Sequence, residues 1–322
     1  MVTRAEVIMA YRLFHGRDPE NQDVVANHAV PSRTLDDLRR DFLTSDEFKA
    51  KFDGVLHDRG NLGHKTLSWP PLRVDDDVSD EQLAGMIARV ERQFRHLGKT
   101  EPHWSVLASD QFKSAHIATH EEQFFNSGRG VVDELRLTAA RCGIDLRRHR
   151  ACLEFGCGIG RSTIWLADEF ATVLGVDIST AHLALAKRAI GRFRKDNIAL
   201  RHVNTIEALG ELPAFDVLFS IIVLQHNPPP VIALILRRLL ARMAPGGIAY
   251  FQLPTYMVGY AFDVDAYLAG RQSLDIPEMH VLGQAQLLRI IGEAGCRVLE
   301  IREDGAAGFD AISNRVLVQK SC

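Results

Sequence analysis

Cysteine is scarce in this chain and is not arranged as a metal site or a disulfide framework would require. The five cysteines make an odd number, and no two of them form a CxxC pair. Zinc sites and disulfide scaffolds depend on paired, regularly spaced cysteines, so neither is expected. No other metal-ligand spacing appears, and we expect no metal. A reducing compartment, the cytoplasm, is the expected location.

Long apolar runs and an excess of positive charge are also missing. The most apolar stretch, residues 231–251, is interrupted by three arginines and Pro245, which excludes a membrane span. The N-terminal segment shows no apolar signal-peptide core. The 38 basic and 41 acidic residues give a formal net charge of −3. Duplex-binding proteins usually carry a basic footprint, so no nucleic-acid partner is expected.

Composition and periodicity divide the 322 residues into three parts. Residues 1–56 have apolar positions at helical spacing and are predicted to form a small helical domain, with one helix starting at Ser32. Residues 57–104 contain a linker rich in Gly, Pro and Asp, followed by a helix. Residues 105–322 are long enough for a complete α/β domain, which begins with a helix predicted to break near Gly128.

From residue 150 onward, apolar segments of strand length alternate with segments of helical periodicity. Helical or loop crossovers separate the first five, which predicts a parallel sheet with helices on both faces. A glycine-containing loop joins the last two, which predicts an antiparallel final strand. The seven expected strands are residues 151–155, 172–177, 198–203, 216–222, 247–253, 297–303 and 315–320.

The first of these strands runs into a glycine turn, LEFGCGIG, in which Gly156, Gly158 and Gly160 stand two residues apart. A dinucleotide fingerprint needs GxGxxG, so the third glycine comes one residue early, and a triphosphate loop needs a lysine that is missing here. Glu154 repels a pyrophosphate and suits a cation. S-adenosylmethionine carries an ammonium and a sulfonium group and is the predicted occupant. A nicotinamide cofactor is the disfavoured alternative.

Polar residues after the next two strands extend this prediction. Asp177 ends the second strand, where an acid about twenty residues after such a turn binds ribose hydroxyls. Its alternative role is to cap the following helix, but Ser179 can do that. Asn204 and Thr205 follow the third strand, where an adenine pocket needs a side-chain acceptor and a backbone N–H. Asp is the usual residue there, so Asn204 is a departure.

Four motifs, LEFGCGIGR, VLGVDIS, FDVLFSIIVLQH and APGGIAYFQ, follow one another in this order. Together they resemble the class I S-adenosylmethionine-dependent methyltransferases over residues 104–320. The resemblance implies an α/β fold with a doubly wound seven-stranded sheet in the order 3-2-1-4-5-7-6, strand seven being antiparallel. It also implies that an upstream helix folds over the cofactor, although an aromatic pair on a helix is more often part of a core. The implied cofactor-binding residues are Glu154, Gly156, Gly158, Gly160, Arg161, Asp177, Ile178, Asn204, Thr205, Ile221, Phe125 and Gly128.

A second resemblance concerns the N-terminal part of the chain. YRLFHGRDPE followed by LRRDFLTSDEF is similar to a small helical domain of unknown function that recurs in bacterial surface and glycosylation proteins. The resemblance implies association, either with a protein partner or between copies of the chain. A helical extension without a function of its own is the alternative.

A methyl acceptor has to be aligned with the methyl donor and shielded from water. If the acceptor is a hydroxyl group, it also has to be deprotonated. His226 follows the fourth strand, and an imidazole titrates in the required range. Its alternative role is only to hydrogen-bond the cofactor or a neighbouring loop. The insertion 252–280 is predicted to be a substrate-facing lid, and its Tyr256 and His280 are further catalytic candidates.

The predicted reaction is O-methylation of a glycan or another small hydroxylated molecule. The second resemblance favours a glycan, and N-methylation of a small amine or peptide is the alternative. A non-catalytic scaffold that binds S-adenosylmethionine belongs to a different class. The intact glycine turn and Asp177 argue against that class, because a degenerate pocket would have lost some of these residues.

Overall fold

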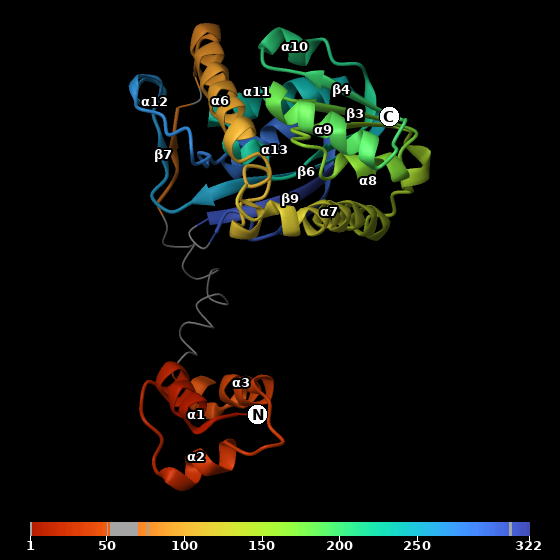
Figure 1. The fold of residues 1–322 in the computed structure, drawn as a ribbon. Helices are drawn as coiled ribbons and strands as arrows, with labels where there is room; N and C mark the ends of the chain where they lie inside the picture. The colour runs from red at the N-terminus through yellow and green to blue at the C-terminus, as the bar shows by residue number, and fades with distance from the viewer. Residues whose placement is uncertain (1, 50, 52–69, 76, 309–310) are drawn as a thin grey trace. The chain divides into compact units, whose positions relative to one another are not determined.

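Two compact units, Met1–Pro70 and Pro71–Cys322, make up the computed structural model of this protein (Figure 1). The predicted domain limits at residues 56 and 104 stay predictions, and the first of them falls within residues 52–69, which lie outside the described part of the chain. The structure describes residues 2–49, 51, 70–75, 77–308 and 311–322.

The first unit is helical, as predicted. Its core holds the buried side chains of Val7, Tyr11 and Phe42, and the rings of Tyr11 and Phe42 meet edge to face at 4.9 Å. The predicted helix start at Ser32 is wrong, because Thr34 and Asp37 form a capping box two residues later. The helices are α1 (Arg4–Ala10), the π-helical turn η1 (Tyr11–His15), α2 (Gln22–His28) and α3 (Leu35–Thr44).

The second unit is built on a seven-stranded sheet with the order β4-β3-β2-β5-β6-β9-β8. Strand β9 is antiparallel to both of its neighbours, and the other pairings from β4 to β6 are parallel. In chain order this is 3-2-1-4-5-7-6, so the expected fold and topology are confirmed. The strands are β2 (Ala151–Phe155), β3 (Thr172–Asp177), β4 (Ile198–His202), β5 (Phe215–Ser220), β6 (Met243–Met257), β8 (Cys296–Glu303) and β9 (Ala311–Lys320).

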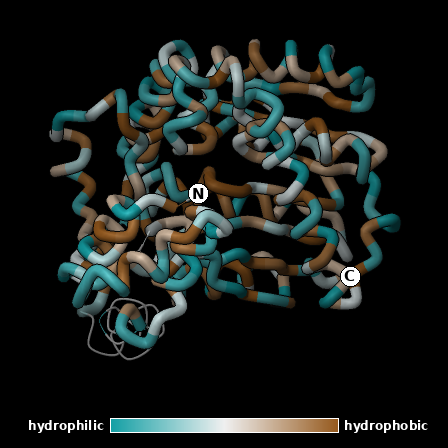
Figure 2. The backbone as a smooth tube through the Cα atoms, turned by 60° about the horizontal axis from the view of Figure 1, so that its bottom comes forward, coloured by the Kyte–Doolittle hydropathy of each residue, from teal (hydrophilic) through white to brown (hydrophobic). Residues whose placement is uncertain are grey.

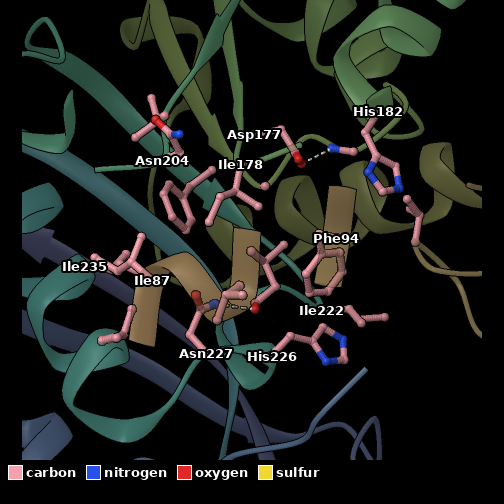
Figure 3. A pocket seen from close by; sticks show the side chains of 18 of the residues that line it. Ile87, Phe94, Asp177, Ile178, His182, Asn204, Ile222, His226, Asn227 and Ile235 are labelled. Atoms are coloured by element: carbon pink, nitrogen blue, oxygen red, sulfur yellow. Dashed lines mark hydrogen bonds between the residues drawn. The ribbon is translucent and has the colours of Figure 1, made fainter. Parts of the chain in front are cut away.

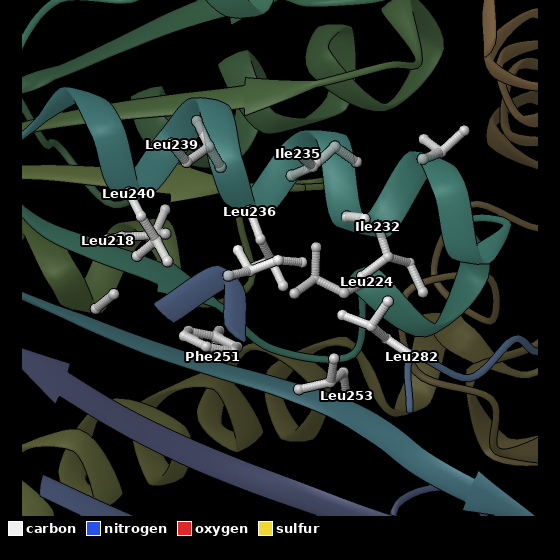
Figure 4. Packing of buried hydrophobic residues seen from close by; sticks show 14 of the residues in the cluster. Leu218, Leu224, Ile232, Ile235, Leu236, Leu239, Leu240, Phe251, Leu253 and Leu282 are labelled. Atoms are coloured by element: carbon white, nitrogen blue, oxygen red, sulfur yellow. The ribbon is translucent and has the colours of Figure 1, made fainter. Parts of the chain in front are cut away.

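Side chains alternate between the two faces of this sheet. The flanking helices are α7 (Glu121–Arg141), α8 (Thr163–Glu169), α9 (Thr180–Arg192), α10 (Ile206–Gly210), α11 (Pro229–Arg242) and α13 (Gln284–Glu293). On β5, Leu218 belongs to the cluster formed with α11 and α13, which Figure 4 shows for α11. Its neighbours Val217 and Phe219 belong to the cluster formed with α7 and α8. The hydrophobic stretches of the strands in Figure 2 are therefore covered from both sides.

Helix α6 (Asp80–Thr100) packs against α9, α11 and α12 of the same unit. Arg89 donates to the carbonyl oxygen of Gly270 at 2.9 Å, and the Gln93 amide donates to the carbonyl of Ser273 at 2.6 Å. The insertion after β6 is therefore fastened to α6. The remaining elements are β1 (Arg73–Val74), β7 (Ala261–Phe262), α12 (Val264–Ala269), η2 (Asp110–Phe112), η3 (Ile117–Thr119), η4 (Leu146–Arg148) and η5 (Leu224–His226).

The break that was predicted near Gly128 and Gly130 does not occur, because α7 is continuous through both glycines. Gly128 stands where α7 meets the turn after β2, and a Cβ atom there would clash with the carbonyl group of Arg161. Gly130 faces open space. Gly128 therefore allows α7 to pack closely on the turn after β2, whereas Gly130 has no packing role.

This contrast gives a matched pair of substitutions. Gly128→Ala is expected to lower the free energy of unfolding by about 1–3 kcal/mol, because the helix has to move away from the turn. Gly130→Ala is expected to raise it by about 0.5–1 kcal/mol, because alanine is the better helix former. Urea unfolding of both variants checks this, and equal effects would contradict the packing role given to Gly128.

Candidate active site

A cavity lies at the carboxyl ends of the central strands, where α6 and α11 meet the loops that follow β2, β3, β4 and β5 (Figure 3). It contains about 850 Å³ of space between protein atoms, part of it open to solvent. Ligands of open α/β sheets bind at this edge, next to the point where the strand order reverses. The predicted residues that line the cavity are Gly156, Gly158, Asp177, Ile178, Asn204, Thr205, Ile221 and His226.

The turn after β2 needs its glycines for two reasons. Gly156 and Gly158 have φ angles of +76° and +54°, which L-residues with side chains rarely adopt. A Cβ atom on Gly156 would clash with Val223, and one on Gly158 would lie 2.7 Å from Val106. Gly160 has φ +86° and packs near Ala186, outside the cavity lining. The turn therefore brings bare backbone to the cavity wall.

Asp177 joins this turn to β3. One carboxylate oxygen accepts a hydrogen bond from the N–H of Gly158 at 2.8 Å, and the other accepts one from the N–H of Ser179 at 2.8 Å. Ser179 caps α9 with its own hydroxyl, so Asp177 is not the cap of that helix. Each carboxylate oxygen can accept a second hydrogen bond. Asp177 can therefore hold the turn and still accept from the hydroxyl groups of a ligand.

Glu154 and Arg161 lie beside the turn but do not line the cavity. Both are buried, and burial raises the pKa of Glu154 to about 8. Arg161 donates to the Ser127 hydroxyl at 3.1 Å. Within the described residues, Oε2 of Glu154 and Nε of Arg161 have no hydrogen-bond partner. Glu154 is therefore protonated near pH 7, and it would have to ionise in order to hold a ligand cation beside Arg161.

His226 ends the short turn η5, which follows β5. Its Nδ1 lies 2.8 Å from the carbonyl oxygen of Glu278 and must donate, because a carbonyl oxygen can only accept. The neutral ring therefore presents Nε2 as an acceptor, 3.4 Å from the amide nitrogen of Gln225. Burial lowers the pKa of His226 to about 4, so the ring is neutral near pH 7. Phe94 of α6 lies beside it, 5.7 Å between ring centroids (Figure 3).

The other two catalytic candidates lie outside the cavity lining, as does the whole insertion 252–280. Nδ1 of His280 lies 2.8 Å from the Tyr260 hydroxyl, and the backbone N–H of His280 donates to the carbonyl of Gln225 at 2.7 Å. Through this backbone hydrogen bond, His280 therefore stabilises the turn that carries His226. Tyr256 lies on β6, next to an irregularity in its pairing with β9.

The two predicted residues on α7 are also outside the lining. Phe125 packs edge to face against Phe124, and its carbonyl oxygen accepts a hydrogen bond from the indole of Trp165 at 2.7 Å. Gly128 contacts Arg161, as described above. Both residues therefore hold α7 against the glycine turn and α8.

Sequence reasoning missed the contribution of α6 and of the segment that follows it. Ile87, Val90 and Phe94 line the cavity from α6, and their spacing of three and four residues is the signal that marks one helical face. Ser105 and His182 also line it and are joined by a 2.8 Å hydrogen bond between the hydroxyl and Nε2. That bond links two segments far apart in the chain, and no sequence pattern marks it.

Neither a metal site nor a membrane-spanning helix is found in the part of the chain that the structure describes. No group of three or more His, Cys, Asp or Glu side chains in this part of the chain could hold a metal ion. No helix there is both long enough and apolar enough to cross a membrane.

Known proteins with similar sequences are methyltransferases. The methyltransferase domain family matches residues 153–249. Trans-aconitate 2-methyltransferase of Deinococcus radiodurans is 36% identical over 112 residues, which are 34% of this chain and 39% of that protein. The tRNA U34 carboxymethyltransferase of Pseudoalteromonas translucida is 38% identical over 106 residues, 32% of each chain. The chain thus spans about a third of the length of these curated relatives.

Solved structures with a similar fold include magnesium protoporphyrin IX methyltransferase from Synechocystis PCC 6803 with bound S-adenosylhomocysteine. Its TM-score is 0.45 at 18% identity, over 67% of this chain and 99% of that one. An S-adenosylmethionine-dependent methyltransferase from Clostridium acetobutylicum gives a TM-score of 0.43 at 11% identity, over 59% and 90% of the two chains. Residues 153–249 thus match the methyltransferase domain family, and the sheet that contains them has the order expected for a class I S-adenosylmethionine-dependent methyltransferase.

Proposed function

We propose that this protein is an S-adenosylmethionine-dependent O-methyltransferase that acts on a small, uncharged, hydroxylated molecule. The observation that carries the proposal is a single cavity lined both by the turn that Asp177 holds and by the neutral ring of His226. When bound, S-adenosylmethionine supplies a methyl group on a sulfonium that is already activated. The chain has to bind it, align the acceptor and take up a proton.

Each part of the cofactor has a proposed set of contacts. Asp177 would accept hydrogen bonds from the ribose hydroxyls, and Asn204 with Thr205 would contact the adenine. The free buried atoms of Glu154 and Arg161 support a role in holding the ammonium and carboxylate of the methionine part. Ile178 and Ile221 would then pack on apolar parts of the cofactor, since both line the cavity.

The charge of the lining supports an uncharged acceptor. The residues around His226 are mostly apolar, among them Ile222, Phe94 and Val231. Among the described residues that line this cavity there is no Lys or Arg to pair with an acidic substrate. An acceptor with several carboxylates, as the name of the Deinococcus relative indicates for that protein, would lack a counter-charge here. A molecule with an apolar body and a hydroxyl group suits this lining. Sugars belong to the same class of neutral hydroxylated acceptors but are more polar.

His226 is the proposed proton acceptor. With Nδ1 donating to Glu278, the lone pair of Nε2 is the acceptor of the ring, and an acceptor hydroxyl would replace the Gln225 amide nitrogen that lies 3.4 Å from it. A base with a pKa of about 4 is weak towards an alcohol in its ground state. The oxygen becomes strongly acidic as its new bond to the methyl carbon forms, so the proton can pass to His226 late in the transfer. The ring would then lose that proton to solvent.

A panel of acceptors tests the reaction class. The protein and S-adenosylmethionine are incubated with neutral hydroxylated compounds, sugars, carboxylates and amines, and products are detected by a mass gain of one methylene group. We expect products among the hydroxylated compounds. Methylation confined to the carboxylates would contradict an uncharged acceptor. Methylation confined to the amines would contradict O-methylation and favour the N-methyltransferase that the sequence left open.

We also propose that the N-terminal unit mediates association in the cytoplasm. Two large apolar side chains four residues apart support this, because Met9 is 55% and Leu13 is 67% exposed. Light scattering of the full chain is expected to give a mass above that of a monomer, and Leu13→Lys is expected to restore the monomer mass. If the protein is a monomer at all concentrations, self-association is contradicted, and the N-terminal unit would have to bind a different protein.

A further inference from the structure

Ile222 has an unusual backbone conformation for its side chain. It lies two residues after the end of β5 and lines the cavity, and its φ angle is +60°. A β-branched residue is rarely found in this left-handed region, because its Cβ substituents crowd the backbone. Such strain persists only where the surrounding structure imposes it, and it is often found at functional sites.

Gln252 supplies the constraint. Its side chain is fully buried on β6, and its Oε1 accepts a hydrogen bond from the backbone N–H of Ile222 at 3.0 Å. Its Nε2 donates to Oε1 of Gln225 at 2.9 Å and to the Ser313 hydroxyl at 2.6 Å. The oxygen and both amide hydrogens of Gln252 are thus in use, so its amide has only one orientation that satisfies all three partners.

Two of these contacts hold the segment that follows β5. One is made to Ile222 and the other to Gln225, the residue before His226 in η5. Val223, between them, is the residue that a side chain on Gly156 would strike, so this turn packs closely on the glycine turn after β2. The buried Gln252 amide therefore fixes the part of the cavity wall that is formed by the glycine turn and the segment carrying His226.

We propose that Gln252 is a positioning residue: it holds Ile222 in its left-handed conformation and thereby shapes the cavity for the cofactor. The ligand's identity rests on the proposed function, whereas the hold of Gln252 on residue 222 does not. Ser313 orients the amide from β9, on the far side from the turn. The strain lies in the backbone of Ile222. We expect this residue to relax to a common conformation when the Gln252 amide is removed.

A double-mutant cycle with S-adenosylhomocysteine as the probe tests this. Gln252→Met keeps the size and the apolar packing but removes the three hydrogen bonds. Relaxing a strained residue corresponds to roughly a 10- to 100-fold change in population, so we expect this variant to bind the probe about 10- to 100-fold more weakly. In an Ile222→Gly background the same change is expected to cost less than about threefold, because glycine adopts positive φ without strain.

The control is Thr255→Val, which removes another buried hydrogen bond between β6 and β9. Asn314 donates to the Thr255 hydroxyl at 2.7 Å, and this bond involves neither Gln252 nor its three partners. Thr255→Val is expected to leave the affinity unchanged. If Gln252→Met does not fold, Gln252→Leu is measured in both backgrounds, because it also removes the acceptor for Ile222, and the same losses of affinity are expected.

The outcomes separate this inference from the proposed function. An equal loss of affinity in both backgrounds, or no loss in either, would overturn the role of Gln252. A crystal structure of the Gln252 variant in which residue 222 keeps φ near +60° would also overturn it, whatever the ligand. Failure of the wild-type protein to bind the probe would instead overturn the proposed function.

Discussion

Replacement of Asp177 by alanine is expected to weaken binding of S-adenosylhomocysteine at least about 100-fold. The carboxylate accepts from the N–H groups of Gly158 and Ser179, at 2.8 Å each. A hydrogen bond to a charged group contributes about 1.5–3 kcal/mol, so losing the two proposed with the ribose hydroxyls corresponds to about 100-fold or more. Losing the two backbone contacts would in addition loosen the glycine turn. Isothermal titration calorimetry measures the change directly.

Asp216 offers a matched control at the opposite end of β2. Its carboxylate also accepts from two backbone N–H groups, those of Arg150 at 2.8 Å and Ala151 at 2.9 Å. Asp216→Ala is expected to lower the free energy of unfolding by a similar amount and to leave ligand binding within about threefold. Equal losses of affinity in the two variants would mean that the Asp177 effect reports stability alone. An Asp177→Ala variant that binds within tenfold of wild type would contradict its role in the site.

Replacement of His226 by alanine is expected to lower the turnover of the acceptor identified in the panel by about 10²–10⁴-fold, the usual contribution of a general base. Affinity for S-adenosylhomocysteine is expected to change less than threefold, because His226 is assigned to the acceptor and not to the cofactor. His226→Gln distinguishes two roles, since an amide oxygen can accept a hydrogen bond but cannot take up a proton. Full activity of the glutamine variant would reduce His226 to an orienting contact.

The pH dependence of turnover gives an independent measure of His226. Its pKa is lowered to about 4 by burial, so the ring stays neutral and able to accept a proton above about pH 5. Wild-type turnover limited by this group should be flat from pH 6 to pH 8 and should fall as the pH approaches 4. An inflection near 6.5, the pKa of an ordinary histidine, that disappears in His226→Gln would contradict the buried environment described here.

Most of the fold could be predicted because the strands of this domain are short apolar segments bounded by polar turns. The sheet order came from the resemblance, and the antiparallel final strand came from the loop before it. The predicted helix break near Gly128 and Gly130 is wrong, because a glycine in a helical pattern does not by itself end the helix. The reason for Gly128 at its position is contact with Arg161, which belongs to a different element. A sequence pattern reports local conformation, and it does not report which elements touch.

The same limit explains the outcome at the site. Asp177 and His226 could be found because both follow parallel strands, whose carboxyl ends meet at one edge of the sheet. His280 and Tyr256 were chosen because their insertion was expected to cover that edge, whereas the insertion is fastened to α6 by Arg89 and Gln93. The left-handed conformation of Ile222 has no sequence signature, because it is imposed by a buried amide thirty residues away along the chain.

The central claim is that this cavity binds S-adenosylmethionine and its product rather than a dinucleotide. Calorimetric titration of the wild-type protein with S-adenosylhomocysteine, followed by a separate titration with NAD, tests it most directly. The account predicts saturable one-to-one binding of S-adenosylhomocysteine and no heat of binding with NAD. Tight binding of NAD, or no binding of S-adenosylhomocysteine to a folded protein, would contradict it.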